Sequence, residues 1–120
     1  HSQGEIIYWK YLDFEPQKSR EIAEYFGQIS GYAVEETPYN SGFAGYKDWF
    51  IQYYDRPGYT IEVGLGQSPL PLTQFEKIYS DNVGILKGGI TKIRKDITTA
   101  AINLRCKTAA YCDTIYSSLK

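Results

Sequence analysis

The sequence predicts an α/β domain with a mixed or parallel sheet. Short apolar segments rich in β-branched and aromatic residues alternate with segments of helical periodicity, and this alternation is typical of strands connected by helices. Strands are expected at residues 4–9, 32–36 and 59–63. The 120 residues are enough for one modest domain with its own core.

Residues 18–30 are expected to form the first helix. Ile22, Phe26 and Ile29 recur at positions i, i+4 and i+7, which places them on one helical face. Gly31 follows directly and is a typical stop signal. The pattern therefore predicts an amphipathic helix between the first two strands.

Further helices are expected after the second strand. A short helix should span residues 47–54. Thr73 followed by Glu76 forms a capping-box pattern that opens the next helix. The Lys-Gly-Gly segment at residues 87–89 is expected to interrupt that helix. Residues 88–120 are predicted to form a basic helical tail packed on the same domain. Its charged face is expected in solvent, and a face that binds a partner is the alternative.

The composition argues against several classes of function. The net charge of −1 gives no support for binding to nucleic acid or to an anionic membrane surface. No apolar run approaches the roughly 20 residues needed to span a bilayer. In a helix, Cys106 and Cys112 would lie on different faces, so they are interpreted as free thiols. The twelve tyrosines suit a groove or a wet interface as well as a core. A chain that begins at His1 is interpreted as processed or truncated.

Glu62 is the most informative single residue. It lies in the expected strand at 59–63, although glutamate is depleted in strands and an unpaired buried carboxylate is costly. Alternation places Thr60, Glu62 and Gly64 on one face of this strand. Two interpretations stay open: a solvated side chain on a half-exposed strand, or a carboxylate held on a rigid strand for acid–base chemistry.

Three short motifs occur in an informative order. His1-Ser2 precedes the first strand, Asp48-Trp49 opens the short helix, and Glu62 lies in the last strand. This order resembles the C-terminal half of the catalytic domain in the zinc carboxypeptidase family, the metallocarboxypeptidases of A/B type. The strand sequence Ile-Glu-Val-Gly with the later Pro-Leu-Pro-Leu looks closest to bacterial γ-D-glutamyl–diaminopimelate peptidases of that family.

The resemblance implies a fold and an activity for residues 1–87. They would be the C-terminal part of a three-layer α/β/α domain with a mixed central sheet, in an enzyme that hydrolyses peptide or γ-glutamyl bonds with one zinc ion. His1 matches the family's third zinc ligand, and its alternative is an ordinary surface residue. Glu62 matches the catalytic base, which takes a proton from the attacking water and delivers it to the departing amine.

The same resemblance implies four substrate-binding residues. Ser2 and Asp48 lie in the motifs that flank the family's substrate site. Tyr39 matches a mobile tyrosine that closes over the substrate, with Tyr46 as the alternative. Lys47 falls where the family sets its side-chain preference. A lysine there would favour an anionic group, such as the extra carboxylate of diaminopimelate, and a solvated lysine is the alternative.

Part of the family's site is absent from the sequence. Its first two zinc ligands form a His-x-x-Glu motif, and this chain has a single histidine. We therefore expect an incomplete zinc site, little turnover by this chain alone, and association either with further copies of itself or with a complementing N-terminal part. The alternative is a non-catalytic fragment, or a module that binds cell-wall peptide or glycan. The exact substrate and the compartment, bacterial cytoplasm or cell wall, stay open.

Overall fold

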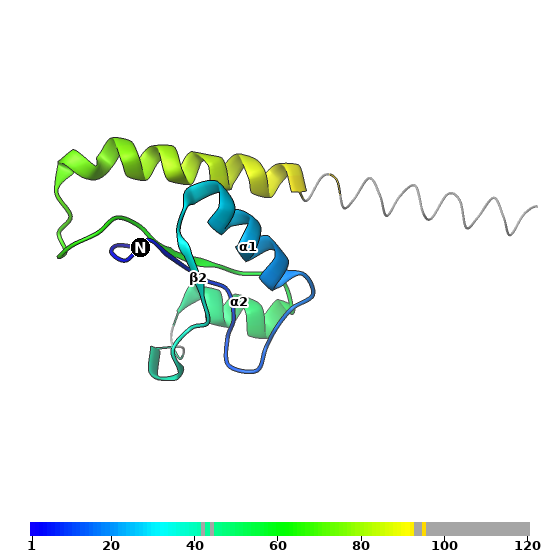
Figure 1. Cartoon of the computed structure of the whole chain (residues 1–120). Helices are drawn as coiled ribbons and strands as arrows, with labels where there is room; N and C mark the ends of the chain where they lie inside the picture. Colours follow the sequence, from blue (N-terminus) through cyan, green and yellow to red (C-terminus); the bar gives the residue numbers. More distant parts are fainter. Residues whose placement is uncertain (42, 44, 93–94, 96–120) are drawn as a thin grey trace, which may run out of the picture. The chain divides into compact units, whose positions relative to one another are not determined.

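A computed structural model describes residues 1–41, 43, 45–92 and 95, and it has the expected α/β fold (Figure 1). Residues 75–92 form its last described helix. The other elements, in chain order, are β1 (Ile6–Tyr8), α1 (Ser19–Ser30), β2 (Ala33–Glu35), η1 (Tyr39–Ser41), α2 (Tyr46–Tyr54), β3 (Thr60–Glu62) and η2 (Leu72–Gln74).

The chain divides into two compact units, His1–Gly88 and Gly89–Lys120. The first unit holds the three strands, α1, η1, α2 and η2. It also includes the last described helix from residue 75 to Gly88. Cys106 and Cys112, and most of the predicted tail, lie outside the described residues. Within the described part of the chain, no helix is long and apolar enough to cross a membrane.

The sheet is mixed and has the strand order β2-β1-β3. β1 runs parallel to β2 and antiparallel to β3. The parallel pair requires a crossover connection, which α1 supplies. In the antiparallel pair Ile6 lies opposite Glu62, and Tyr8 lies opposite Thr60. These four side chains therefore share one face of the sheet.

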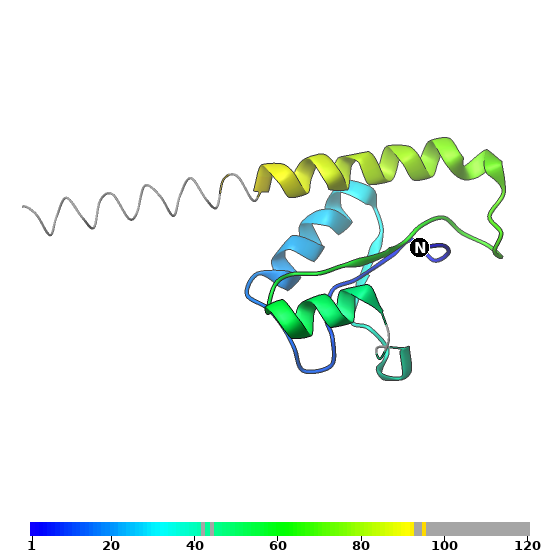
Figure 2. The ribbon, with the colours of Figure 1, turned by 180° about the vertical axis from the view of Figure 1, so that it is seen from behind.

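The hydrophobic core covers the other face of the sheet. α1 crosses in front of β3 in Figure 1 and behind it in Figure 2, so the helix lies against one face. Ile7 of β1 is fully buried there, and Ile61 of β3 packs against the same cluster. The remaining buried members of this cluster are Trp9, Ala23, Phe26, Tyr32 and Ile85. The alternation predicted for residues 59–63 is confirmed, because Thr60 and Glu62 point away from this core.

The predicted interruption at residues 87–89 is wrong. The helical assignment continues through these residues to residue 92. A Cβ at Gly88 would lie 2.8 Å from Cδ1 of Ile29, and one at Gly84 would lie 2.5 Å from Cγ2 of the same side chain. The glycines therefore let this helix approach α1 closely. This packing offsets the roughly 1 kcal/mol that a glycine costs inside a helix.

The predicted capping box is also wrong. Thr73 lies inside the 3₁₀ turn η2, so it does not occupy the position before the helix. The side chain of Gln74 accepts a hydrogen bond from the backbone N–H of Leu65 at 3.0 Å and donates to the carbonyl oxygen of Leu65 at 2.7 Å. The side-chain amide of Gln74 therefore closes the loop after β3.

Candidate functional site

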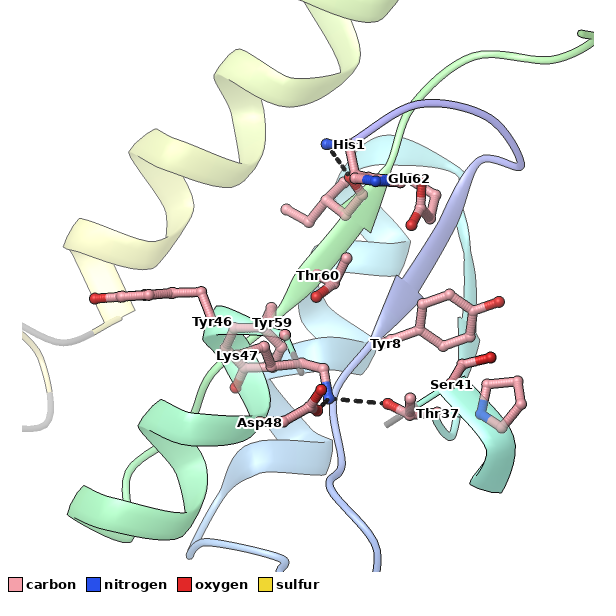
Figure 3. Close-up of a pocket in the computed structure, with 13 residues that line it drawn as sticks. His1, Tyr8, Thr37, Ser41, Tyr46, Lys47, Asp48, Tyr59, Thr60 and Glu62 are labelled. Carbon is pink, nitrogen blue, oxygen red and sulfur yellow. Dashed lines mark hydrogen bonds and ion pairs between the residues drawn. The ribbon is translucent and has the colours of Figure 1, made fainter. Parts of the chain in front are cut away.

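A pocket of about 630 Å³ lies on the face of the sheet opposite the core (Figure 3). Its walls come from the N-terminus, β1, the segment after β2, the first turn of α2, and β3. Four residues predicted from the sequence line it together: His1, Lys47, Asp48 and Glu62. His1, the adjacent pair Lys47 and Asp48, and Glu62 come from three distant parts of the chain, so tertiary folding creates this group.

Backbone hydrogen bonds along β3 hold His1 beside Glu62. The N-terminal ammonium donates to the carbonyl oxygen of Ile61 at 3.1 Å, and the N–H of Val63 donates to the carbonyl oxygen of His1 at 3.1 Å. Ser2 forms a parallel bridge with Val63. The N-terminus therefore runs alongside the strand that carries Glu62.

The side chains of His1 and Glu62 are in direct contact. Nδ1 of His1 lies 2.7 Å from Oε2 of Glu62. The imidazole is 74% exposed, whereas the Glu62 side chain is 15% exposed. Burial raises the pKa of the Glu62 carboxyl above its ordinary value, and the nearby N-terminal ammonium partly opposes this. A carboxylate with a raised pKa is a better proton acceptor, which suits acid–base chemistry.

Lys47 and Asp48 form a second pair, and it is buried. The Lys47 ammonium donates to the carbonyl oxygen of Lys10 at 2.8 Å and to Oγ1 of Thr37 at 2.9 Å. Its third contact is the Asp48 carboxylate. These contacts use all three donors of the ammonium group. Lys47 therefore ties the start of α2 to the segments that follow β1 and β2.

Two predicted substrate residues, Ser2 and Tyr39, do not line the pocket. Oγ of Ser2 is 3.5 Å from Oγ of Ser68. Tyr39 belongs to η1, is 72% exposed, and packs edge-on against Phe43 at 5.4 Å between ring centroids. Tyr46, the alternative to Tyr39, does line the pocket. The structure thus brings Tyr46 to the candidate site, and it does not bring Tyr39 there.

Five polar pocket residues were missed by the sequence analysis: Tyr8, Thr37, Ser41, Tyr59 and Thr60. Alternation with Glu62 is a signal that could have identified Thr60. Tyr8 required the strand register, which places it opposite Thr60. Burial raises the pKa of the Tyr8 hydroxyl, and negative charges nearby, including that of Glu62, act in the same direction.

The donor atoms at this site fit a zinc ion only in part. An imidazole beside a carboxylate is suitable chemistry, but a catalytic zinc site requires three protein ligands. Among the described residues, no group of three or more His, Cys, Asp or Glu side chains lies close enough to hold a metal ion. Any complete metal site therefore needs ligands from elsewhere.

Two curated proteins are similar to this chain. It is 44% identical over 90 residues, or 75% of its length, to gamma-D-glutamyl-L-diamino acid endopeptidase 1 of Lysinibacillus sphaericus. It is also 44% identical over 86 residues, or 72% of its length, to the uncharacterized protein YqgT of Bacillus subtilis strain 168. The matches cover 22% and 23% of these relatives, so the chain spans less than a quarter of their length.

No protein-family model matches the chain, and no solved structure matches it significantly. The predicted likeness to γ-D-glutamyl peptidases is confirmed in part, because one relative carries a name of that kind. Membership of the zinc carboxypeptidase family stays a prediction.

Proposed function

We propose that this chain carries part of the active site of a peptidase that hydrolyses γ-D-glutamyl–diamino acid bonds in cell-wall peptides. The observation that supports this most is the pocket in which Glu62, partly buried on a strand, contacts His1. The relative from Lysinibacillus sphaericus supports the reaction class, since its name describes that bond.

Glu62 is the proposed general base. Its carboxylate would accept a proton from the water that attacks the scissile carbonyl carbon. When the carbon–nitrogen bond breaks, the same group would deliver that proton to the departing amine. The strand position suits this role, because a catalytic group on a rigid element keeps its geometry.

We further propose that the chain belongs to the zinc carboxypeptidase family and that its cofactor is one zinc ion. When bound, it would polarise the scissile carbonyl and lower the pKa of water. His1 would supply one ligand through its exposed imidazole. Because the described residues lack a group of three ligands, a complementing N-terminal part would provide the others. Association of this chain with further copies of itself is the competing proposal for its partner.

The substrate preference is proposed to depend on the pocket wall at Lys47 and Asp48. An anionic substrate group would approach a lysine whose donors are already in use, so it would have to compete with the Asp48 carboxylate. Tyr46 is better placed than Tyr39 to contact a bound peptide. Ser2 and Tyr39 keep their predicted roles only if they move toward the pocket.

The test is peptide hydrolysis by this chain, supplied with zinc and the N-terminal part of the domain. We expect Glu62→Gln to lower turnover by about 10²- to 10⁴-fold while peptide binding is kept, because one proton-transfer group is lost. Glu35→Gln is the matched control, since Glu35 is an exposed carboxylate on β2, at the other edge of the same sheet. Undiminished turnover by the Glu62→Gln protein would contradict the proposal.

A non-catalytic binding module is the second candidate function. It is supported by the incomplete ligand set among the described residues and by the exposed aromatic side chains of α2. The same experiment separates the two functions. Peptide binding without turnover by the unmodified, complemented protein would favour the binding module.

A further inference from the structure

One side of α2 presents a row of aromatic rings to solvent. Tyr46, Tyr53 and Trp49 are 77%, 71% and 48% exposed. We call this surface the α2 aromatic face, and its members are Tyr46, Trp49, Phe50, Tyr53 and Tyr54. Exposed aromatic side chains are costly to hydrate when gathered together, so such a patch indicates a binding surface.

The rings of the α2 aromatic face hold one another in place. Trp49 stacks on Tyr53 with ring centroids 5.9 Å apart, and Tyr46 stacks on Phe50 at 6.2 Å, each with an interplanar angle of 22°. Tyr54 closes the row, 4.8 Å from Tyr53 between centroids. Residues four apart in a helix are neighbours, so the helix sets this spacing.

The opposite side of α2 is fixed in the protein. Lys47, Asp48 and Ile51 are buried there. The aromatic rings therefore stand on a rigid base, and a ligand would not have to order them. Preorganisation of this kind raises affinity because less entropy is lost on binding.

The chemistry of the face suits an uncharged, hydroxyl-rich ligand. The only charged side chains in α2 are Lys47 and Asp48, and both are buried. The exposed groups are ring faces, tyrosine hydroxyls and the Gln52 amide. Ring faces carry negative charge density that attracts the slightly positive C–H bonds of a sugar ring, while the polar groups can form hydrogen bonds. An anionic polymer such as a nucleic acid would find no exposed cation on this helix.

The face is continuous with the pocket through Tyr46. This residue lines the pocket, and Figure 3 shows its ring extending away from the other labelled side chains. We propose that the α2 aromatic face binds the glycan of the bacterial cell wall, an uncharged chain of N-acetylated sugar rings. The inference rests on the proposed function, in which the pocket takes the peptide attached to that glycan.

The experiment measures binding of an oligomer of β-1,4-linked N-acetylglucosamine to the full chain by calorimetry. We expect Tyr53→Ala to weaken binding by about two- to tenfold, as loss of one stacked ring predicts. Tyr39→Ala is the matched control, because Tyr39 is equally exposed and lies outside α2. Circular dichroism of both variants checks that the fold is kept.

Three outcomes would overturn the glycan site: no binding of the oligomer, an equal loss in the two variants, or a chain that dimerises through Tyr53. Sedimentation detects such a dimer as a species that the unmodified chain forms and the Tyr53→Ala protein does not. The proposed function is tested separately, because the oligomer contains no peptide. Glu62→Gln should leave oligomer binding unchanged, and Tyr53→Ala should leave hydrolysis of a free peptide unchanged. A chain that binds the oligomer through Tyr53 but lacks hydrolysis when complemented supports the glycan site and overturns the peptidase.

Discussion

The two ends of the pocket hold similar chemical pairs in opposite environments. At one end the imidazole of His1 contacts Glu62 and is largely exposed. At the other end Lys47 contacts Asp48, and both are buried with further hydrogen-bond partners. A buried pair is hard to separate because each lone charge would be left unsolvated. The Lys47–Asp48 pair therefore holds the pocket wall in place, whereas in the His1–Glu62 pair the imidazole is open to solvent.

Removing Lys47 should have the largest effect on stability. Lys47→Met leaves the Asp48 carboxylate buried without its partner, and we expect the free energy of unfolding to fall by about 3–5 kcal/mol. Urea denaturation measures this. The double variant Lys47→Met/Asp48→Asn should recover much of the loss, since no buried charge remains. Equal losses in the single and double variants would show that the pair is not the source of the effect.

Gly64→Ala should have the next largest effect, at the end of the strand that carries Glu62. Gly64 has φ of +68°, and a Cβ there would lie 2.6 Å from Leu70 and 2.8 Å from Gln74. We expect a loss of about 2–3 kcal/mol in the free energy of unfolding. Gly66→Ala is the control, because Gly66 also has positive φ but no atom lies within 4 Å of its Cβ. The Gly66→Ala protein should lose less of its free energy of unfolding than the Gly64→Ala protein.

Thr37→Val tests one acceptor of the Lys47 ammonium. Its hydroxyl accepts from Lys47 at 2.9 Å and donates to the carbonyl oxygen of Lys10 at 2.7 Å. Valine has nearly the same shape, so we expect a loss of about 1–2 kcal/mol from the missing hydrogen bonds. Thermal unfolding measures it, with Thr73→Val at an exposed position as the control. A loss no larger than the control's would mean that the ammonium does not depend on this hydroxyl.

His1→Ala should have the smallest effect on stability. The imidazole is exposed, so we expect the free energy of unfolding to change by less than about 0.5 kcal/mol. Zinc binding by the complemented protein should nevertheless weaken, because one proposed ligand is lost. Urea denaturation and metal titration measure the two effects. A large loss of stability would remove the contrast between the ends of the pocket.

The sequence by itself determined the features that depend on local geometry. Alternation of side chains along a strand placed Glu62 and Thr60 on one face, and helical spacing predicted α1 from Ile22 and Phe26. The resemblance carried by the motifs that contain His1 and Asp48 also indicated residues that prove to line one pocket. The inferences from alternation and helical spacing hold because they require no knowledge of neighbouring segments.

Only the tertiary structure decided which distant segments meet. The register of β1 on β3 put Tyr8 opposite Thr60, and the packing of α1 kept the helix continuous through Gly88. The sequence predicted Lys47 as a solvated or substrate-binding cation. In the structure its ammonium is buried and donates hydrogen bonds to the carbonyl oxygen of Lys10 and to the Thr37 hydroxyl. The energies of such contacts depend on burial and on the interacting partners. The spacing of residues along the chain specifies neither of these.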